Sequence, residues 1–391
     1  MADQRLVWSS RSVKVVHVIS SLKVGGAESM LRKLIETSSA RDHLVVSLST
    51  VGEMGAILRA QGIEVRALGM GSPLSILRTA ARLAALLRQE QPDVVQTWMY
   101  HADFLGGLVA KALGIRVVWS VRTTELPQSG SSVTRWIRSC CARLSTKIPA
   151  RIVYAANASR RLHEGLGYAS TKSLVIPNGF QMDRLRHGWA SREAIRLEFG
   201  LRRGDIAIGC VGRFHDDKDP LNFLRAGARL IQQGHELRLL MVGRELVDGN
   251  PTLAGWIQDL GLQGRVLMLG ERSDVPACLG AMDVFCLPSK TEGFPNVLGE
   301  AMGVGIPCVA TDVGDVRVVL GDCGIVVPPE DSEALAAGLE QVLRWSAEER
   351  AARVDAGRQR IADHYSIEAT CRKFEQVYDG KEDQGESACA V

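Results

Sequence analysis

Short apolar runs alternate with amphipathic stretches along the first half of the chain. The apolar runs predict seven strands, at Val13–Ile19, Leu44–Ser49, Ile63–Leu68, Val94–Thr97, Val117–Val121, Ile152–Tyr154 and Leu174–Ile176. Helical patterns follow several of them, as at Ala27–Thr37. In the pattern over Leu74–Arg88, one face is expected to hold Leu74, Leu77, Ala81, Ala84 and Leu87. Strands that alternate with helices predict a parallel sheet covered on both faces.

The alternation restarts in the second half of the chain. Six further strands are predicted, at Ile206–Val211, Leu237–Val242, Val266–Leu269, Val284–Leu287, Cys308–Ala310 and Ile325–Val327. Helical patterns end the chain, at Glu333–Trp345, Glu349–His364 and Ile367–Tyr378. We therefore predict an α/β protein of two doubly wound, Rossmann-like parallel-sheet domains that face each other across a cleft. Ligands of such sheets bind at the carboxyl ends of the strands, so the loops that follow the strands should carry the chemistry.

Composition and charge narrow the picture. The 391 residues suit two globular domains, no apolar run is long enough to span a bilayer, and residues 1–11 lack the pattern of a signal peptide. Nine cysteines without metal-ligand spacing favour reduced thiols in the cytoplasm. Residues 1–183 carry 23 Lys and Arg against 12 Asp and Glu, a net +11, whereas 184–391 carry 24 against 32. The basic half indicates a polyanionic partner (a membrane face, a diphosphate-linked acceptor or nucleic acid) or a chance surface composition.

The loop after Ile206–Val211 carries two cations, Arg213 and Lys218, before a helix predicted to begin near Pro220. Two cations beside the N–H groups of a helix start suit a diphosphate, although solvated surface cations are the alternative for this loop taken alone. Three acids in the loop are similar to a Mg²⁺ or Mn²⁺ cluster, but helix capping or solvation explains them more simply. These acids are Asp216, Asp217 and Asp219.

The loop after Val284–Leu287 is more informative. Glu292 is predicted to project over a helix N-terminus, and Glu300 lies within that helix and is expected to be buried with a partner. Carboxylates are good partners for vicinal hydroxyls, so Glu292 is expected to hold a sugar and Glu300 a ribose. Backbone N–H groups at the helix start are expected to point at a phosphate, namely those of Phe294, Asn296 and Val297.

Two weaker signals lie in other strand–helix loops. Gly25 and Gly26 permit close approach of the backbone to a ligand, with an ordinary tight turn as the alternative. The segment 270–275 follows a strand and is suited to border a nucleotide base, with a helix cap by Ser273 or Asp274 as the alternative.

Together these segments resemble a known family. Glu292 with residues 293–302 resembles the glutamate-x7-glutamate motif of the retaining family 4 glycosyltransferases, which have GT-B architecture. Further pieces match in the expected order over nearly the whole chain: Gly25-Gly26-Ala27-Glu28, Val175-Ile176-Pro177-Asn178-Gly179, Gly212-Arg213 with Lys218, and Cys308-Val309-Ala310-Thr311-Asp312-Val313-Gly314. Each piece is short, but the ordered set is specific.

The resemblance implies site residues. Arg213 and Lys218 would neutralise the donor diphosphate as it leaves, while Glu292 would hold the sugar and Glu300 the ribose. Backbone groups would contact the sugar and phosphate at Phe294, Asn296 and Val297. The base would be lined by Glu271, Arg272 and Val275. Gly25 and Gly26 would close against the donor and acceptor.

Three residues of the first half are expected on the acceptor side. His101 follows the strand Val94–Thr97 and is predicted to contact the acceptor or sugar, with helix capping as the alternative. Tyr100 beside it is a further acceptor candidate. Many relatives have a histidine after the next strand, where this chain has Arg122, so Arg122 is predicted instead to bind an anionic group of the acceptor or donor.

The implied organisation is an acceptor-side domain over 1–183, a nucleotide-sugar donor domain over 184–363, a helix over 364–380 that packs back on the first domain, and a disordered tail over 381–391. The implied reaction is retaining transfer, without metal or other cofactor, from a nucleotide sugar to a glycan or lipid-diphosphate-linked acceptor. Exopolysaccharide or lipopolysaccharide assembly in the cytoplasm, at the inner membrane face, is the expected setting, with no nucleic acid as partner. A basic patch for an anionic membrane is expected at Arg135, Trp136, Arg138 and Arg143.

Three alternatives stand beside this hypothesis. A non-catalytic sugar-nucleotide-binding or scaffolding protein of the same fold would bind the donor without turnover. A glycan phosphorylase would need a lysine in a pyridoxal phosphate site, and no lysine here has that context. A Rossmann oxidoreductase would carry Gly-x-Gly-x-x-Gly at the first turn, which residues 20–27 do not supply.

Overall fold

The computed structural model describes residues 13–23, 25–38, 42–71, 75–124 and 131–381. Contacts divide the chain into two compact units. The N-terminal unit falls within Met1–Ala155, Ser159–Ile176 and Thr370–Val391, and the C-terminal unit within Ala156–Ala158 and Pro177–Ala369. The boundary predicted from the sequence lies between residues 183 and 184, whereas the division by contacts falls between Ile176 and Pro177.

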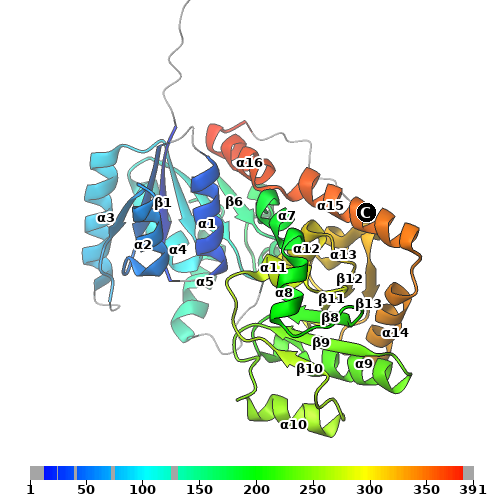
Figure 1. Ribbon diagram of the computed structural model, residues 1–391. Helices are drawn as coiled ribbons and strands as arrows, with labels where there is room; N and C mark the ends of the chain where they lie inside the picture. Colours follow the sequence, from blue (N-terminus) through cyan, green and yellow to red (C-terminus); the bar gives the residue numbers. More distant parts are fainter. Residues whose placement is uncertain (1–12, 24, 39–41, 72–74, 125–130, 382–391) are drawn as a thin grey trace, which may run out of the picture. The chain divides into compact units, whose positions relative to one another are not determined.

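The N-terminal unit is built on a parallel sheet with the order β3-β2-β1-β4-β5-β6-β7 in its described part (Figure 1). Its strands are β1 Lys14–Ile19, β2 Asp42–Ser47, β3 Glu64–Ala67, β4 Val94–Trp98, β5 Arg116–Val121, β6 Arg151–Tyr154 and β7 Ser173–Val175. Its helices are α1 Gly26–Thr37, α2 Gly52–Ala60, α3 Ile76–Glu90, α4 Tyr100–Ala112, α5 Ser132–Leu144 and α6 Asn157–Gly165, with a 3-10 turn at Ser170–Lys172. The first two residues of α6 group with the C-terminal unit. The central strands are buried along almost their whole length, as a sheet covered on both faces requires.

The predicted face of α3 is wrong. Leu77 is 83% exposed, and Leu74 lies outside the described residues. The buried side chains of this helix are Thr79, Leu83, Leu86 and Leu87. They repeat at steps of four, three and one and form one stripe, from which Leu77 is rotated away. The predicted face is counted from Leu74, which precedes the first residue of the helix, Ile76.

The C-terminal unit has a second parallel sheet, with the order β10-β9-β8-β11-β12-β13 in its described part. Its strands are β8 Ile206–Val211, β9 Leu237–Val242, β10 Val266–Met268, β11 Val284–Leu287, β12 Cys308–Thr311 and β13 Ile325–Val327. Its helices are α7 Met182–Ala190, α8 Arg192–Glu198, α9 Pro220–Gln232, α10 Pro251–Asp259, α11 Val275–Gly280, α12 Asn296–Val304, α13 Val316–Leu320, α14 Ser332–Leu343 and α15 Ala347–Tyr365, with 3-10 turns at Asp216–Lys218 and Gly321–Cys323. The predicted fold class, two Rossmann-like parallel-sheet domains, is confirmed.

The last described helix, α16 Ile367–Asp379, crosses from one unit to the other along the chain. From Thr370 onward it belongs to the N-terminal unit, where Phe374 is fully buried and Arg116 donates to the Val377 carbonyl at 3.0 Å. This is the segment expected at 364–380; the tail expected over 381–391 lies outside the described residues except for Lys381. Among the described helices, none combines the length and apolar character needed to cross a bilayer.

Four groups form a directed hydrogen-bond chain inside the N-terminal unit. Trp98 Nε1 donates to His17 Nδ1 at 3.3 Å, His17 Nε2 lies 3.0 Å from His43 Nδ1, and His43 Nε2 lies 3.3 Å from the Ser38 carbonyl oxygen. An indole N–H is a donor and a carbonyl an acceptor, so this chain places one proton on Nε2 of each neutral imidazole. Burial lowers the pKa of His17 well below its usual value, and the neighbouring His43 lowers it further.

This buried chain predicts that the protein loses stability in mild acid. Because the pKa of His17 is depressed in the folded state, the unfolded chain binds the proton more tightly. The stability contribution is therefore complete above the unfolded pKa of about 6.5 and is lost as the pH falls below it. His17→Gln should lower stability at pH 7.5, because it breaks the chain, and should reduce the further loss between pH 7 and pH 5.

Denaturant titrations at each pH measure both effects, with exposed His187→Gln as the control. Burial also lowers the pKa of His163, so part of the pH dependence should remain in the His17 variant. A pH dependence as steep as that of the unaltered protein would contradict the assignment.

Candidate functional site

In the C-terminal unit, the candidate residues follow the two strands at which the strand order reverses. β8 and β11 are parallel neighbours, with β9 and β10 on one side and β12 and β13 on the other (Figure 1). The loops that follow β8 and β11 therefore leave the same edge of the sheet. This is the position at which open α/β sheets bind ligands.

The loop after β8 presents Arg213 and Lys218. Its start is fixed to the end of β9, because the N–H groups of Gly212 and Phe214 donate to the carbonyls of Val242 and Arg244 at 2.9 and 2.8 Å. Arg213, between them, is exposed.

The other end of this loop is a short 3-10 turn that includes Lys218. Asp219 then caps α9, with its carboxylate 3.2 Å from the Asn222 N–H, and Pro220 occupies the first turn. Both cations are thus on a loop anchored at its two ends.

Lys218 and Glu292 form an ion pair across the two loops. Lys218 Nζ lies 2.6 Å from Glu292 Oε1, and the buried Ser289 hydroxyl donates to the same oxygen at 2.7 Å. The Glu292 side chain is 10% exposed and that of Lys218 is 30% exposed, so the pair is open to solvent mainly on the lysine side. The structure therefore brings together a cation and a carboxylate that are 74 residues apart in the sequence.

The start of α12 agrees with the prediction only in part. Asn296 does not offer a free N–H, because that N–H donates to the Phe294 carbonyl at 2.9 Å; this corrects the prediction for Asn296. The side chain of Phe294 is buried and its ring stacks on Phe180. The first hydrogen bond of helix α12 is donated by the Gly299 N–H to the Pro295 carbonyl at 3.2 Å. Val297 comes earlier in the chain, so its N–H is not part of that helical pattern.

Glu300 lies in the second turn of α12. It is half-buried, not fully buried as the sequence had suggested. The correction has a simple cause: the apolar neighbours Leu298, Ala301 and Met302 turn to the buried side of the helix, while Glu300 is at its margin.

The expected base-lining residues surround the start of α11. Arg272 is engaged by two carboxylates: it donates to Asp274 from Nε at 2.8 Å and from Nη2 at 2.7 Å, and to Glu198 from Nη1 at 2.8 Å. These hydrogen bonds raise the pKa of Arg272. Asp274 is the N-cap residue of α11, but its carboxylate holds Arg272 and makes no capping bond. Glu271 is exposed and Val275 is half-buried.

The three acids after β8 have separate partners. Asp216 binds Lys290 at 2.7 Å, Asp217 lies 3.0 Å from His215, and Asp219 caps α9. No group of three or more histidine, cysteine, aspartate or glutamate side chains that could hold a metal occurs within the described ranges.

In the N-terminal unit, candidate residues follow β1 and β4, which are parallel neighbours at the reversal of strand order in that sheet. Gly25 is the N-cap residue of α1 and has an extended backbone. A Cβ there would collide with the carboxylate of Glu28, whose pKa is raised by burial. Gly26 has open space around it. The Glu28 side chain could move away from such a Cβ, so the expected approach of a ligand to Gly25 stays a prediction.

The loop after β4 places Tyr100 and His101 in the first turn of α4. Tyr100 is 4% exposed, and its hydroxyl lies 2.6 Å from His163 Nε2. Its prediction as an acceptor contact is corrected, because the ring belongs to the core of this unit. His101 is half-buried, and burial lowers its pKa. The N-cap residue of α4 is Met99, so the alternative of helix capping by His101 is wrong.

Arg122 follows β5 and contacts its own unit. Its guanidinium lies over the rings of Trp98 and Phe374, at 5.6 and 5.3 Å from their centroids. Nε donates to Ser120 Oγ at 3.1 Å and Nη1 to the Ile176 carbonyl at 2.9 Å. These contacts tie α16 to the sheet. Its anion-binding role stays a prediction, and the structure adds a structural role.

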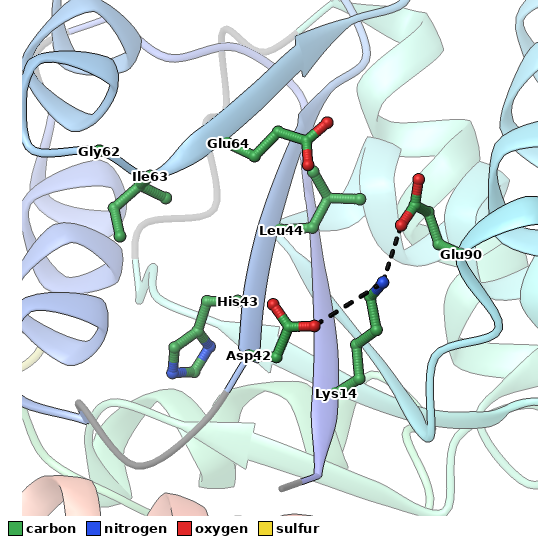
Figure 2. Close-up of a pocket in the computed structure, with 8 residues that line it drawn as sticks. All are labelled: Lys14, Asp42, His43, Leu44, Gly62, Ile63, Glu64 and Glu90. Atoms are coloured by element: carbon green, nitrogen blue, oxygen red, sulfur yellow. Dashed lines mark hydrogen bonds and ion pairs between the residues drawn. The ribbon is translucent and has the colours of Figure 1, made fainter.

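A cavity of about 260 Å³ lies elsewhere in the N-terminal unit. Figure 2 shows the residues that line it. Lys14, Asp42 and Glu64 on its wall are the first residues of β1, β2 and β3, so it lies at the amino ends of the strands. Lys14 Nζ is 2.7 Å from Glu90 and 3.7 Å from Asp42, and Arg66 pairs with Glu90 and Glu64 at 2.8 and 2.5 Å. The charged side chains at this cavity therefore pair with one another. The cavity also lies at the edge of the sheet opposite to the one at which such sheets bind ligands.

Comparison with known proteins decides the family. The family model described as "Glycosyltransferase Family 4" matches residues 24–184, and the one described as "Glycosyl transferases group 1" matches residues 205–344. The chain belongs to the family 4 glycosyltransferases. The two matches together include both loops of the C-terminal unit and the strand–helix turns of the N-terminal unit.

Relatives of this glycosyltransferase are themselves named as glycosyltransferases. It is 27% identical over 247 residues to the UDP-Gal:alpha-D-GlcNAc-diphosphoundecaprenol alpha-1,3-galactosyltransferase of Escherichia coli, over 61% of this chain and 62% of that protein. It is 26% identical to the putative glycosyltransferase EpsF of Bacillus subtilis, over 87% of this chain and 89% of that protein. Among solved structures, the chain is similar to Anabaena Alr3699/HepE in complex with UDP, with a TM-score of 0.83 and 20% sequence identity. The match includes 94% of this chain and 100% of the Anabaena chain.

The sequence prediction missed the groups that support Glu292 in this glycosyltransferase. Ser289 is fully buried and donates to the Glu292 carboxylate. Thr311 Oγ1 donates in turn to the Ser289 carbonyl at 2.6 Å, and the Asp315 N–H donates to the Gly293 carbonyl at 3.1 Å. Thr311 lies in the segment 308–314, whose resemblance to the family is the signal that could have identified it.

Proposed function

We propose that this glycosyltransferase moves a sugar from a nucleotide sugar to a glycan or lipid-diphosphate-linked acceptor, with retained anomeric configuration and without a metal ion. The Lys218–Glu292 pair carries this proposal, because it joins a cation suited to a diphosphate and a carboxylate suited to sugar hydroxyls at one sheet edge. The UDP of the Anabaena complex and the diphosphoundecaprenol acceptor of the Escherichia coli relative support these substrate classes.

In the proposed reaction, the bond from the anomeric carbon to the diphosphate breaks and both electrons leave with the nucleoside diphosphate. An acceptor hydroxyl forms the new bond to the same carbon, and its proton passes to the departing phosphate. Arg213 and Lys218 stabilise the negative charge that develops on the leaving oxygen. Because these two cations supply the charge that a metal would otherwise supply, transfer should persist in excess EDTA.

The two glutamates have binding roles in this proposal. Glu292 Oε1 is held by Lys218 and Ser289, so Oε2 is the oxygen expected to accept a sugar hydroxyl. Glu300 would bind the ribose. His101 would contact the acceptor or sugar as a neutral imidazole near pH 7, because its pKa is lowered by burial.

Thermal-shift screening against a panel of nucleotide sugars tests this function. One donor should raise the melting temperature of the unaltered protein, and the shift should be absent or much smaller in Glu292→Ala and Arg213→Ala. Lys290→Ala, a change in the same loop as Glu292, is the control and should keep the shift. Equal stabilisation of all four proteins would overturn the assigned site. Binding with neither transfer nor donor hydrolysis would favour the non-catalytic alternative.

We further propose that α5 contacts an anionic membrane surface. Trp136 is 60% exposed and Val133 is 52% exposed, and the indole packs edge-on against Phe104 of α4. Arg135 and Arg143 on the same helix are exposed as well. Apolar rings flanked by arginines, in the half of the chain with a net +11, suit a layer of acidic headgroups.

Vesicle co-sedimentation tests the membrane proposal. The protein should bind vesicles that contain phosphatidylglycerol more strongly than pure phosphatidylcholine vesicles, and added salt should weaken that binding. Trp136→Ser combined with Arg135→Ser should reduce it about tenfold. Leu197→Ser, at an 80% exposed leucine of the C-terminal unit, is the matched control. Equal binding to both kinds of vesicle would exclude this surface.

A further inference from the structure

The turn between β12 and α13 supports the backbone that carries Glu292. Gly314, in this turn, has a φ of +58°, and a Cβ there would collide with the Glu292 carbonyl and lie 2.7 Å from that of Gly293. The next residue, Asp315, donates its N–H to the Gly293 carbonyl at 3.1 Å. The Glu292–Gly293 peptide therefore rests directly against this turn.

Asp315 is itself fixed by its side chain. The residue is 3% exposed, and its carboxylate accepts hydrogen bonds from the N–H groups of Asn157 and Ala158 at 2.6 and 2.8 Å and from Asn157 Nδ2 at 3.3 Å. The two partners lie in Ala156–Ala158, a short segment that packs with the C-terminal unit. Three N–H donors compensate a buried carboxylate well, so the position of Asp315 is tightly determined.

The carboxylate of Asp315 does not cap its own helix but binds the first two N–H groups of α6. Asp315 is the N-cap residue of α13, but its side chain makes no bond to that helix. Its oxygens bind a segment about 158 residues away, while its N–H binds the peptide next to Glu292. One residue thus joins the first residues of α6 to the backbone of the candidate donor site.

We propose that Asp315 is a positioning residue for the donor site: its carboxylate, held by Asn157 and Ala158, fixes the N–H that holds the Gly293 carbonyl. Through that peptide it sets where the Glu292 carboxylate meets Lys218. The inference rests on the proposed function, because it assigns Asp315 to the site that binds the nucleotide sugar. It extends that function to a residue that touches neither the sugar nor the diphosphate.

Two kinetic variants test the proposal. In Asp315→Ala, the donor KM should rise roughly tenfold with a smaller fall in kcat, since Glu292 is expected to bind the sugar in both the ground and the transition state. Asp315→Asn keeps one acceptor oxygen and should recover part of the loss. Asp312→Ala is the matched control: Asp312 lies in the same turn, and its side chain binds Arg317 at the surface. Folding of each variant is checked by thermal melting.

A second readout needs no donor. In the free protein, the ion pair with Glu292 should protect Lys218 from an acylating reagent, and Lys290 serves as the internal reference. Mass spectrometry should find Lys218 acylated about threefold faster in Asp315→Ala, and unchanged in Asp312→Ala. A variant that melts at a lower temperature but keeps the donor KM and the Lys218 reactivity of the unaltered protein would overturn the proposal. An unaltered protein without any donor turnover would refute the proposed function and leave the acylation result to decide the role of Asp315.

Discussion

Replacing Lys218 by alanine is expected to lower the rate of sugar transfer by about 10²–10³-fold, the effect of removing one fixed group that stabilises developing charge. The ammonium is held 2.6 Å from Glu292 Oε1, on a loop anchored to β9 at its start and to α9 at its end. Its removal takes a positive charge from the place where the diphosphate is expected to leave. Lys218→Arg keeps the charge with a different shape and should recover only part of the rate.

Lys290 provides the control for this prediction. Its side chain is 28% exposed, close to the 30% of Lys218, and it binds Asp216 at 2.7 Å. Lys290→Ala should therefore reduce the rate only a few-fold, since pairs this exposed contribute up to about 1 kcal/mol. Initial rates of nucleoside diphosphate release measure both variants. Equal losses in the two would show that Lys218 has no special place in the reaction.

The largest expected effect on stability comes from Gly243→Ala. Gly243 follows β9 with a φ of +143°, and a Cβ there would collide with the carbonyl oxygen of Gly212. The unfavourable backbone and the collision together should lower the free energy of unfolding by about 3 kcal/mol or more. Because the peptide that must move precedes Arg213, the variant should also bind the donor more weakly.

Calorimetry measures this prediction, as a fall of roughly 6–12 °C in the melting temperature of the C-terminal unit. Gly255→Ala is the control. Gly255 lies within α10, and a Cβ there would have nothing within 4 Å. That substitution should leave stability unchanged or raise it by up to about 1 kcal/mol. If the Gly243→Ala variant melted at the same temperature as the unaltered protein, this would contradict the close approach of Gly243 to the Gly212 carbonyl.

Much of the fold could be predicted because short buried strands have a strong local signal. β8, β9, β11 and β13 have the predicted bounds, since each is a short, mainly apolar run that ends directly before a glycine or a proline. The face of α3 could not be predicted in this way. That helix has apolar residues on more than one side, and the core against which it packs decides which of them are buried.

The candidate site could be predicted as a set of residues but not as a set of partners. Arg213, Lys218 and Glu292 were identified from loops that follow strands, and parallel neighbours β8 and β11 bring those loops to one edge. The contacts of Arg122 and Asp315 depend on segments far away in the chain, Phe374 and Asn157 among them. No local pattern marks such pairs, because they form only when the units fold.

The account depends on Arg213, Lys218 and Glu292 binding one molecule of an activated sugar. A crystal structure of the full chain with a bound nucleoside diphosphate sugar tests this most directly. It should show the diphosphate against Arg213 and Lys218 and the sugar hydroxyls against Glu292. Density for the diphosphate away from the loop after β8, with the Lys218–Glu292 pair untouched by the ligand, would contradict the account.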